Sequence, residues 1–196
     1  MGSLEPTILT EYFCREASKL KKLCPHFHVS LQSGSNTVLK RMNRHYTAEM
    51  YKKYVENLRK YFSNPAITTD VIAGFNMETE EEHAETMRFL SDIQFAKVHV
   101  FPYSERKGTA AVKMGGALPM SLRKQRAQQL IELCDKMQGK YISMFLGERV
   151  NVLFEEDHEG YAYGYTDRYV RVRGSALPNE MKEVLIKQIQ GDTLIS

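Results

Sequence analysis

The stretch that most constrains the fold is residues 67–82, which read ITTDVIAGFNMETEEE. A short run of apolar and β-branched residues ends at Gly74, and an acidic stretch then leads into a helical pattern. This order predicts a buried parallel strand, a turn, and a helix whose acidic first turn complements the helix dipole. Thr79 and Glu82 have the spacing of a capping box. Such a unit occurs in any α/β protein, and ligand sites form at the carboxyl ends of its strands.

Strand-like and helical patterns alternate on both sides of this unit. Strands are predicted near residues 2–5, 27–31 and 97–101. Helices are predicted over residues 7–23, 36–44, 47–62, 79–91 and 121–145, with Thr47 and Ser121 as N-caps, and a loop over residues 103–114. This alternation implies βα units with a parallel sheet.

After Gly147 the pattern changes to short β-type runs broken by Gly, Asp and Pro. The runs cover residues 148–155, 160–166, 169–173, 183–190 and 193–195. They predict a small antiparallel, OB-like barrel of about five strands. The chain is therefore expected to be α/β with two units, residues 1–140 and residues 141–196.

Composition and charge exclude several classes of protein. No apolar run approaches the roughly 18 residues of a membrane helix, and nothing at the start resembles a signal peptide. The three cysteines (Cys14, Cys24 and Cys134) are far apart and odd in number, which argues against a disulfide framework and fits a reducing cytoplasm. They also lack the close spacing of a zinc or iron–sulfur site. The net charge of +3 divides into +5 for residues 1–137 and −2 for residues 138–196, so the first part is compatible with a polyanionic partner.

Polar residues gather at the predicted strand ends. If the strands are parallel and adjacent, these groups converge on one rim and suit a ribose or amino-acid ligand; alternatively, each is a turn or cap residue. They are Glu5, Gln32, Ser33, Ser35, Asp70, Glu78, Tyr103 and Ser104. Gly74 would let a ligand or a neighbouring backbone approach closely. Arg41 and Arg44 match a carboxylate or phosphate, or form a solvated helix face.

The small barrel interleaves aromatic and basic residues, as nucleic-acid-binding barrels do. Strand alternation places the tyrosines of YAYGY on one face, which is either the barrel core or a binding surface. The residues concerned are Tyr161, Tyr163, Tyr165, Tyr169, Arg168, Arg171 and Arg173. The six histidines show no metal spacing, and His28 and His99 are interpreted as packed side chains. No Ser–His–Asp order, nucleophile elbow or phosphate loop is present.

Three long motifs carry a family resemblance: HVSLQSGSNTVLKRMNRHYT, ITTDVIAGF with ETEEE, and HVFPYS with GTAA. In this order they resemble the radical SAM methylthiotransferases that modify tRNA, and SLEPT at the start is similar to that family's third barrel strand. FHVSLQSG and VHVFPYS are most similar to the branch that acts on threonylcarbamoyladenosine beside the anticodon. The closing region resembles the TRAM domain, a small RNA-binding β-barrel.

The resemblance implies a partial (β/α) barrel, strands three to six of a radical SAM barrel, followed by a TRAM-like barrel. It implies S-adenosyl-L-methionine (SAM) as cofactor and the tRNA anticodon loop as partner. Carried over by position, the SAM-binding residues are Glu5, Gln32, Ser33, Ser35, Arg41, Arg44, Asp70, Gly74, Glu78, Pro102 and Tyr103. The expected RNA-binding residues are Arg106, Lys107, Arg168, Arg171 and Arg173.

Two departures from the family pattern limit the expected activity. Asn76 and Met77 stand where the family usually has Pro-Gly. The family's 4Fe-4S clusters are held by a Cys-x3-Cys-x2-Cys motif and by three further cysteines, and this chain has neither set. The chain therefore resembles the C-terminal part of such an enzyme without its N-terminal half, and we expect no catalytic or metal-ligating residue in it and no activity alone. The alternatives are the isopentenyladenosine branch, a non-catalytic tRNA-binding module and a stand-alone SAM-binding domain.

Overall fold

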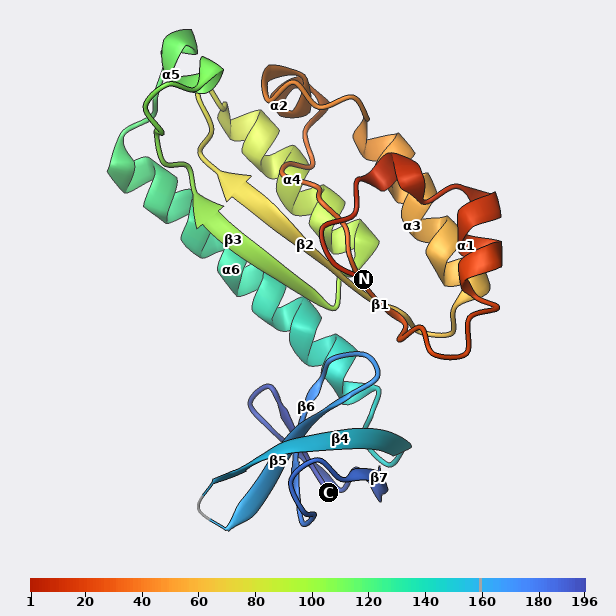
Figure 1. Cartoon of the computed structure of the whole chain (residues 1–196). Coiled ribbons are helices and arrows are strands. Elements are labelled where there is room, and N and C mark those ends of the chain that lie inside the picture. Colours follow the sequence, from red (N-terminus) through yellow and green to blue (C-terminus); the bar gives the residue numbers. More distant parts are fainter. Residues whose placement is uncertain (159) are drawn as a thin grey trace.

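The computed structural model describes residues 1–158 and 160–196, which form a larger α/β unit followed by a smaller sheet unit (Figure 1). The larger unit is built on three parallel strands in the order β1-β2-β3, namely β1 (His26–His28), β2 (Ala66–Ala73) and β3 (Lys97–Pro102). An isolated parallel bridge between Leu4 and Val29 extends this sheet beyond β1. The expected parallel strands are thus confirmed, but the one predicted near residues 2–5 is reduced to a single bridge.

Helices cover one face of this sheet. The helices of the larger unit are η1 (Pro6–Ile8), α1 (Glu11–Ala17), α2 (Asn36–Arg41), α3 (Ala48–Tyr61), α4 (Glu80–Ile93), α5 (Ala110–Met114) and α6 (Met120–Ser143). The short α5 is the exception, because its Ala111 packs with Ile72 and Tyr103 at the strand ends. Alternate residues of β2, Ile67, Val71 and Ala73, are buried in one apolar core with residues of α3, α4 and α6. Asp70 and Ile72, on the opposite side of the same strand, stay half-buried, so the other face of the sheet is available for a site. Figure 1 shows α4 and α6 running alongside the strands.

Helix ends show where the expectations hold and fail. Thr79 and Glu82 form the predicted capping box: the Glu82 N–H donates to Thr79 Oγ1, and Glu82 Oε2 accepts from the Thr79 N–H at 2.9 Å. Thr47 is the N-cap of α3, as predicted. The prediction of Ser121 as an N-cap is wrong. Helix α6 begins at Met120, and its N-cap is Pro119, whose ring presets its φ.

Three other predicted boundaries need correction. The helix predicted over residues 7–23 is only α1, because Pro6 starts a separate 3-10 turn and Thr10 caps the helix. The helix over residues 36–44 ends at Arg41. The loop predicted over residues 103–114 contains the short helix α5. No helix in the described ranges is long and apolar enough to cross a membrane.

The small unit is a curled sheet with the strand order β7-β4-β5-β6-β9-β8. Its strands are β4 (Arg149–His158), β5 (Tyr161–Thr166), β6 (Arg171–Gly174), β7 (Met181–Leu185), β8 (Gln188–Gln190) and β9 (Thr193–Ile195). The chain passes from one edge strand to the other through Ile186, whose N–H donates to the Glu148 carbonyl. Six strands are therefore described where about five were expected, because Ile186 splits the last long run. The pairing of β6 with β9 is parallel, so the sheet is not wholly antiparallel.

The two units share a junction. Ala66 and Ala96 of the larger unit, and Phe145 directly after α6, pack into the same apolar cluster as the core of the small sheet. Arg168 is the polar anchor of this junction, since its Nε donates to the Asn64 carbonyl at 2.9 Å and its Nη2 to the Ser63 carbonyl at 3.0 Å. The Tyr141 hydroxyl donates to the same Asn64 carbonyl.

Candidate functional site

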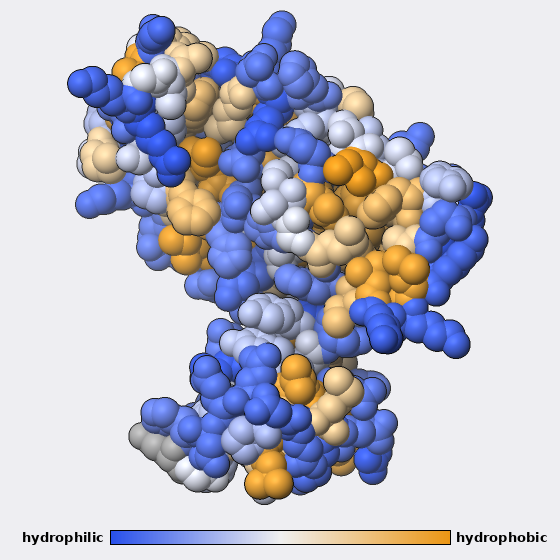
Figure 2. Space-filling view, viewed as in Figure 1, coloured by the Kyte–Doolittle hydropathy of each residue, from blue (hydrophilic) through white to orange (hydrophobic). Residues whose placement is uncertain are grey.

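A pocket of about 490 Å³ opens where β2 and β3 end, on the sheet face that the helices leave uncovered. Six of its lining residues were predicted from the sequence as strand-end polar groups, SAM-binding residues or RNA-binding residues: Gln32, Asp70, Pro102, Tyr103, Ser104 and Arg106. The lining residues are Gln32, Asp70, Ile72, Phe101, Pro102, Tyr103, Ser104, Arg106, Thr109 and Ala111. Strand-end residues that are distant in sequence thus meet at one rim, as the parallel order requires. Figure 2 shows hydrophobic and hydrophilic side chains mixed over the larger unit and mostly hydrophilic ones on the small unit.

The acidic group of this pocket is held in a short polar chain. Asp70 Oδ2 lies 3.3 Å from His28 Nε2, and His28 Nδ1 lies 3.0 Å from Thr68 Oγ1. The Asp70 side chain is 35% exposed, so its carboxylate also faces the pocket. His28 is therefore more than a packed side chain, because it orients the carboxylate.

Tyr103 supplies the pocket's buried hydroxyl. Its ring stacks edge-on against Phe75 at 4.9 Å, and the Arg123 guanidinium lies over it at 5.2 Å from the centroid. Within the described residues its hydroxyl oxygen is buried without a hydrogen-bond partner. An unpaired buried polar group costs roughly 1–3 kcal/mol, and a polar group of a ligand would relieve that cost.

Ser33 and Ser35 do not reach this pocket. Ser33 Oγ lies 3.1 Å from Thr86 Oγ1, and Ser35 Oγ donates to Glu85 Oε2 at 2.5 Å. Both serines are buried against α4, so they tie the loop after β1 to that helix. The turn after β1 and the neighbouring helix α4 set the direction of the two hydroxyls. Residue type and position after a strand do not reveal that direction.

The two predicted arginine clamps are both paired with acids. Arg41 Nη2 donates to Glu82 Oε2 at 2.5 Å, and Arg44 Nη1 donates to Glu5 Oε1 at 3.3 Å. Burial raises the pKa of Glu82, but hydrogen bonds from Arg41 and Thr37 outweigh it and leave that pKa below its ordinary value. Arg44 and Glu5 are the more exposed pair, and neither pair lines the strand-end pocket.

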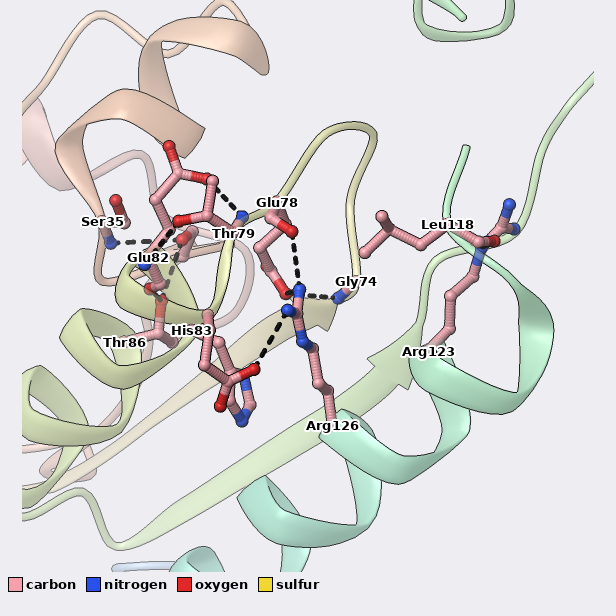
Figure 3. A network of polar contacts seen from close by, with 12 residues as sticks. Ser35, Gly74, Glu78, Thr79, Glu82, His83, Thr86, Leu118, Arg123 and Arg126 are labelled. Atoms are coloured by element: carbon pink, nitrogen blue, oxygen red, sulfur yellow. Dashed lines mark hydrogen bonds and ion pairs between the residues drawn. The ribbon is translucent and has the colours of Figure 1, made fainter. Parts of the chain in front are cut away.

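Glu78 and Gly74 belong to a buried network rather than to the pocket wall (Figure 3). Glu78 Oε1 accepts from the Gly74 N–H at 3.0 Å and from Arg126 Nη1 at 2.9 Å. Burial is the main cause that raises the pKa of Glu78. Gly74 has φ +70°, and an added Cβ would lie 3.0 Å from the Arg123 Cα. Of the two possibilities for Gly74, the structure therefore shows the close approach of a neighbouring backbone, that of α6.

Arg123 and Arg126 are the network residues that sequence reasoning missed. Arg126 joins Glu78 to Glu80, and Arg123 donates to the Tyr103 carbonyl at 3.0 Å and to the Leu118 carbonyl at 2.7 Å. The apolar pattern of α6 predicts the helix but not these contacts. The available signal was two arginines three residues apart on that helix.

The tyrosines of YAYGY face outward, so they do not form the core of the small unit. Ala162, Gly164 and Thr166 point into the small unit's core, and the tyrosines alternate with them. The Arg171 guanidinium lies 4.5 Å from the Tyr163 ring centroid and that of Arg173 lies 4.8 Å from Tyr161. Arg106 and Lys107 are exposed in the loop after β3, and Arg106 also lines the pocket. Arg168, in contrast, is committed to the junction.

The cysteines do not fit an iron–sulfur cluster. Burial raises the pKa of Cys14 to about 11 and that of Cys134 to about 12, so both thiols stay protonated, whereas clusters bind thiolates. Cys24 is exposed. Among residues 1–158 and 160–196, no group of three or more His, Cys, Asp or Glu side chains is arranged to hold a metal ion.

Comparison with known proteins gives this fold and site a context. Residues 5–90 match the model of the Radical SAM superfamily. In structure, the chain is similar to coproporphyrinogen III oxidase (HemN) from Escherichia coli, a radical SAM enzyme, with a TM-score of 0.58 and 16% identity over 69% of this chain and 31% of that one. This likeness is one of fold.

Similar sequences include tRNA methylthiotransferases of two kinds. Threonylcarbamoyladenosine tRNA methylthiotransferase MtaB of Bacillus subtilis is 38% identical over 177 residues, which cover 88% of this chain and 39% of that protein. tRNA-2-methylthio-N(6)-dimethylallyladenosine synthase of Protochlamydia amoebophila is 41% identical over 150 residues, 76% of this chain and 33% of that protein. MtaB of Chlamydia pneumoniae is 33% identical over 199 residues, 100% of this chain and 47% of that protein. The chain spans less than half the length of these relatives.

Proposed function

We propose that this chain forms the SAM-facing strands and an RNA-binding sheet of a tRNA methylthiotransferase. The enzyme would add a methylthio group to C2 of N6-threonylcarbamoyladenosine beside the anticodon. The observation that carries the proposal is the strand-end pocket in which Gln32, Asp70 and Tyr103 meet. The match of residues 5–90 to the Radical SAM superfamily supports the assignment of SAM to that pocket.

The pocket chemistry suits the adenosine end of SAM. The Asp70 carboxylate would accept hydrogen bonds from ribose hydroxyls, and the Gln32 amide can both donate and accept. Ile72 and Phe101 offer apolar surface for a planar base. The unpaired Tyr103 hydroxyl would gain a partner. SAM, when bound, supplies the methyl group and the one-electron chemistry, for which the cluster ligands must come from outside these 196 residues.

The substrate branch rests on the two strand motifs. FHVSLQSG and VHVFPYS resemble the threonylcarbamoyladenosine branch, and the similarity to the Bacillus subtilis MtaB extends over more of this chain than the similarity to the Protochlamydia amoebophila synthase. The isopentenyladenosine branch is the alternative substrate. A non-catalytic tRNA-binding module is the alternative function, favoured by the outward row of tyrosines and arginines on the small unit.

Binding of S-adenosylhomocysteine to the purified chain tests the pocket, because its adenosine end does not depend on a cluster. Asp70→Ala removes a charged acceptor whose hydrogen bonds are worth about 1.5–3 kcal/mol. We therefore expect isothermal titration calorimetry to give a dissociation constant about 10- to 100-fold higher than that of the wild type. Lys124→Ala, at an exposed position on α6, is the matched control and should bind as the wild type does. Equal affinity for the wild type and Asp70→Ala, or no binding by the wild type, would refute this assignment.

A further inference from the structure

A second pocket, of about 360 Å³, lies between the two units and is distinct from the strand-end pocket. It draws side chains from both sides of the junction. The larger unit contributes His26 and His28 from β1 and Lys97 and His99 from β3. The small unit contributes Tyr165, Arg168, Tyr169 and Arg171. We call this pocket the junction crevice.

The charge of the junction crevice favours an anion. Among the described residues, the side chains of Lys97 and Arg171 have no ion pair or hydrogen-bond partner, and the Arg171 guanidinium lies over the Tyr163 ring. Arg168 is also cationic, and Asp192 is the acidic residue of the lining. Burial lowers the pKa of His26 and of His99, so both rings are neutral at pH 7. The cationic character at that pH therefore comes from lysine and arginine, whose donors match phosphate oxygens.

An aromatic column stands beside these cations. The Tyr165 and Tyr169 rings stack at 4.5 Å with an interplanar angle of 10°, and the His26 ring stacks on Tyr169 at 5.4 Å and 18°. The column thus joins the small unit to β1 of the larger unit.

The backbone of Tyr169 is unusual. Its φ is +59°, a left-handed conformation that is costly for a bulky residue, and the residue is 64% exposed. Its N–H donates to the Thr166 carbonyl at 2.9 Å, which holds the turn. Strain kept at an exposed aromatic residue points to a function for the ring rather than to packing.

We propose that the junction crevice binds a nucleotide of single-stranded RNA, with the phosphate on Lys97 and Arg171 and the base against the column of Tyr165, Tyr169 and His26. Paired cations and stacked aromatics are the elements by which proteins hold single strands. The strand would continue over the outward face of β5 and β6, where Arg171 and Arg173 cover Tyr163 and Tyr161. The choice of RNA as the polyanion rests on the proposed function.

Fluorescence anisotropy with a labelled anticodon stem-loop tests this site. Removal of both cations that hold the phosphate in Lys97→Ala/Arg171→Ala should weaken binding at least 10-fold and reduce the slope of log K against log salt by about 0.7, the value for one phosphate on a single strand. Tyr169→Asn removes the ring while keeping a residue that tolerates positive φ. Loss of the Tyr169 ring breaks the column between Tyr165 and His26. Since base stacking is worth about 1–3 kcal/mol, the Tyr169→Asn variant should bind RNA about 5- to 100-fold more weakly with an unchanged salt slope.

The matched control is Lys113→Ala/Lys124→Ala, which removes the same charge from exposed positions outside the crevice. It should leave affinity within about 2-fold of the wild type. Wild-type RNA binding that the crevice variants do not change would overturn the crevice and leave the proposed function standing. Displacement of the RNA by inorganic phosphate at a concentration equal to that of the RNA would also overturn the proposal, because the crevice would then be a simple anion site. No RNA binding by the wild type would overturn both the crevice and the RNA-binding part of the proposed function, while S-adenosylhomocysteine binding would still report on the strand-end pocket.

Discussion

Arg126→Ala is expected to lower the free energy of unfolding by about 3–5 kcal/mol, because it leaves the buried Glu78 carboxylate without its cation. The Glu78 and Arg126 side chains are only 2% and 5% exposed, and their closest atoms are 2.9 Å apart. Arg126 also donates to the Glu78 carbonyl at 2.8 Å, so two buried acceptors lose one donor. Chemical denaturation at pH 7, followed by circular dichroism, measures the loss.

The pH dependence of this loss is a second observable. The pKa of Glu78 in the folded protein already lies above its ordinary value, mainly through burial. A raised pKa means that the group's contribution favours folding at low pH and declines as the pH rises through the folded value. Without Arg126 the pKa rises further, so the penalty should be larger at pH 7 than near the ordinary glutamate value of about 4.3. Glu78→Gln/Arg126→Ala, which buries no charge, should recover part of the stability at pH 7.

Lys124→Ala is the control on the same helix and should change the free energy of unfolding by less than about 0.5 kcal/mol, since Lys124 is exposed. If the free energy of unfolding of Arg126→Ala stays within about 1 kcal/mol of the wild-type value, the buried ion pair does not exist in solution. The network in Figure 3 would then not hold β2, α4 and α6 together.

Gly164→Ala is expected to lower the free energy of unfolding by about 3 kcal/mol or more, at the upper end of overpacking effects. An added Cβ would lie 2.1 Å from the Leu153 carbonyl oxygen and 2.7 Å from the Phe154 Cα. These are backbone atoms of the paired strand β4, next to the register shift between Phe154 and Glu156, so no side-chain movement can make room. The strands β4 and β5 must separate.

Amide hydrogen exchange locates this effect. Protection should fall in β4 and β5, while β2 in the larger unit keeps its protection. Gly139→Ala is the matched control: Gly139 lies within α6 and nothing is within 4 Å of its added Cβ. Alanine should there raise stability by about 0.5–1 kcal/mol. A Gly164→Ala protein that is as stable as the wild type would contradict the close packing of β4 on β5.

The sequence predicted those parts of the fold that depend on local patterns. The run 67–73 with its capping box gave β2 and α4, because strand alternation and caps are encoded within a few residues. The meeting of Gln32, Asp70 and Tyr103 followed from the parallel order. Helix starts were less accurate, since Pro6 begins a separate 3-10 turn and Pro119 takes the N-cap position expected for Ser121.

The parts that could not be predicted depend on partners distant in the chain. Arg126 meets Glu78 across 48 residues, and Arg168 meets Asn64 across 104 residues. Arg168 was expected on RNA because residue type alone shows a cation near tyrosines, and that expectation stays a prediction. Its hydrogen bonds to Asn64 and Ser63, which join the units, could not be predicted. The inward or outward direction of YAYGY likewise required the position of the core, because alternation fixes which residues share a face but not which face is buried.

The central proposal is that this chain forms part of a tRNA methylthiotransferase that acts on threonylcarbamoyladenosine. The most direct test is to express the complete gene product that contains it in a host without its own methylthiotransferases, and to measure tRNA nucleosides by mass spectrometry. We expect 2-methylthio-N6-threonylcarbamoyladenosine to appear with the wild type, to fall strongly with Asp70→Ala, and to persist with Lys124→Ala. Methylthiolation of isopentenyladenosine instead, or unmodified threonylcarbamoyladenosine with the wild type, would contradict the claim.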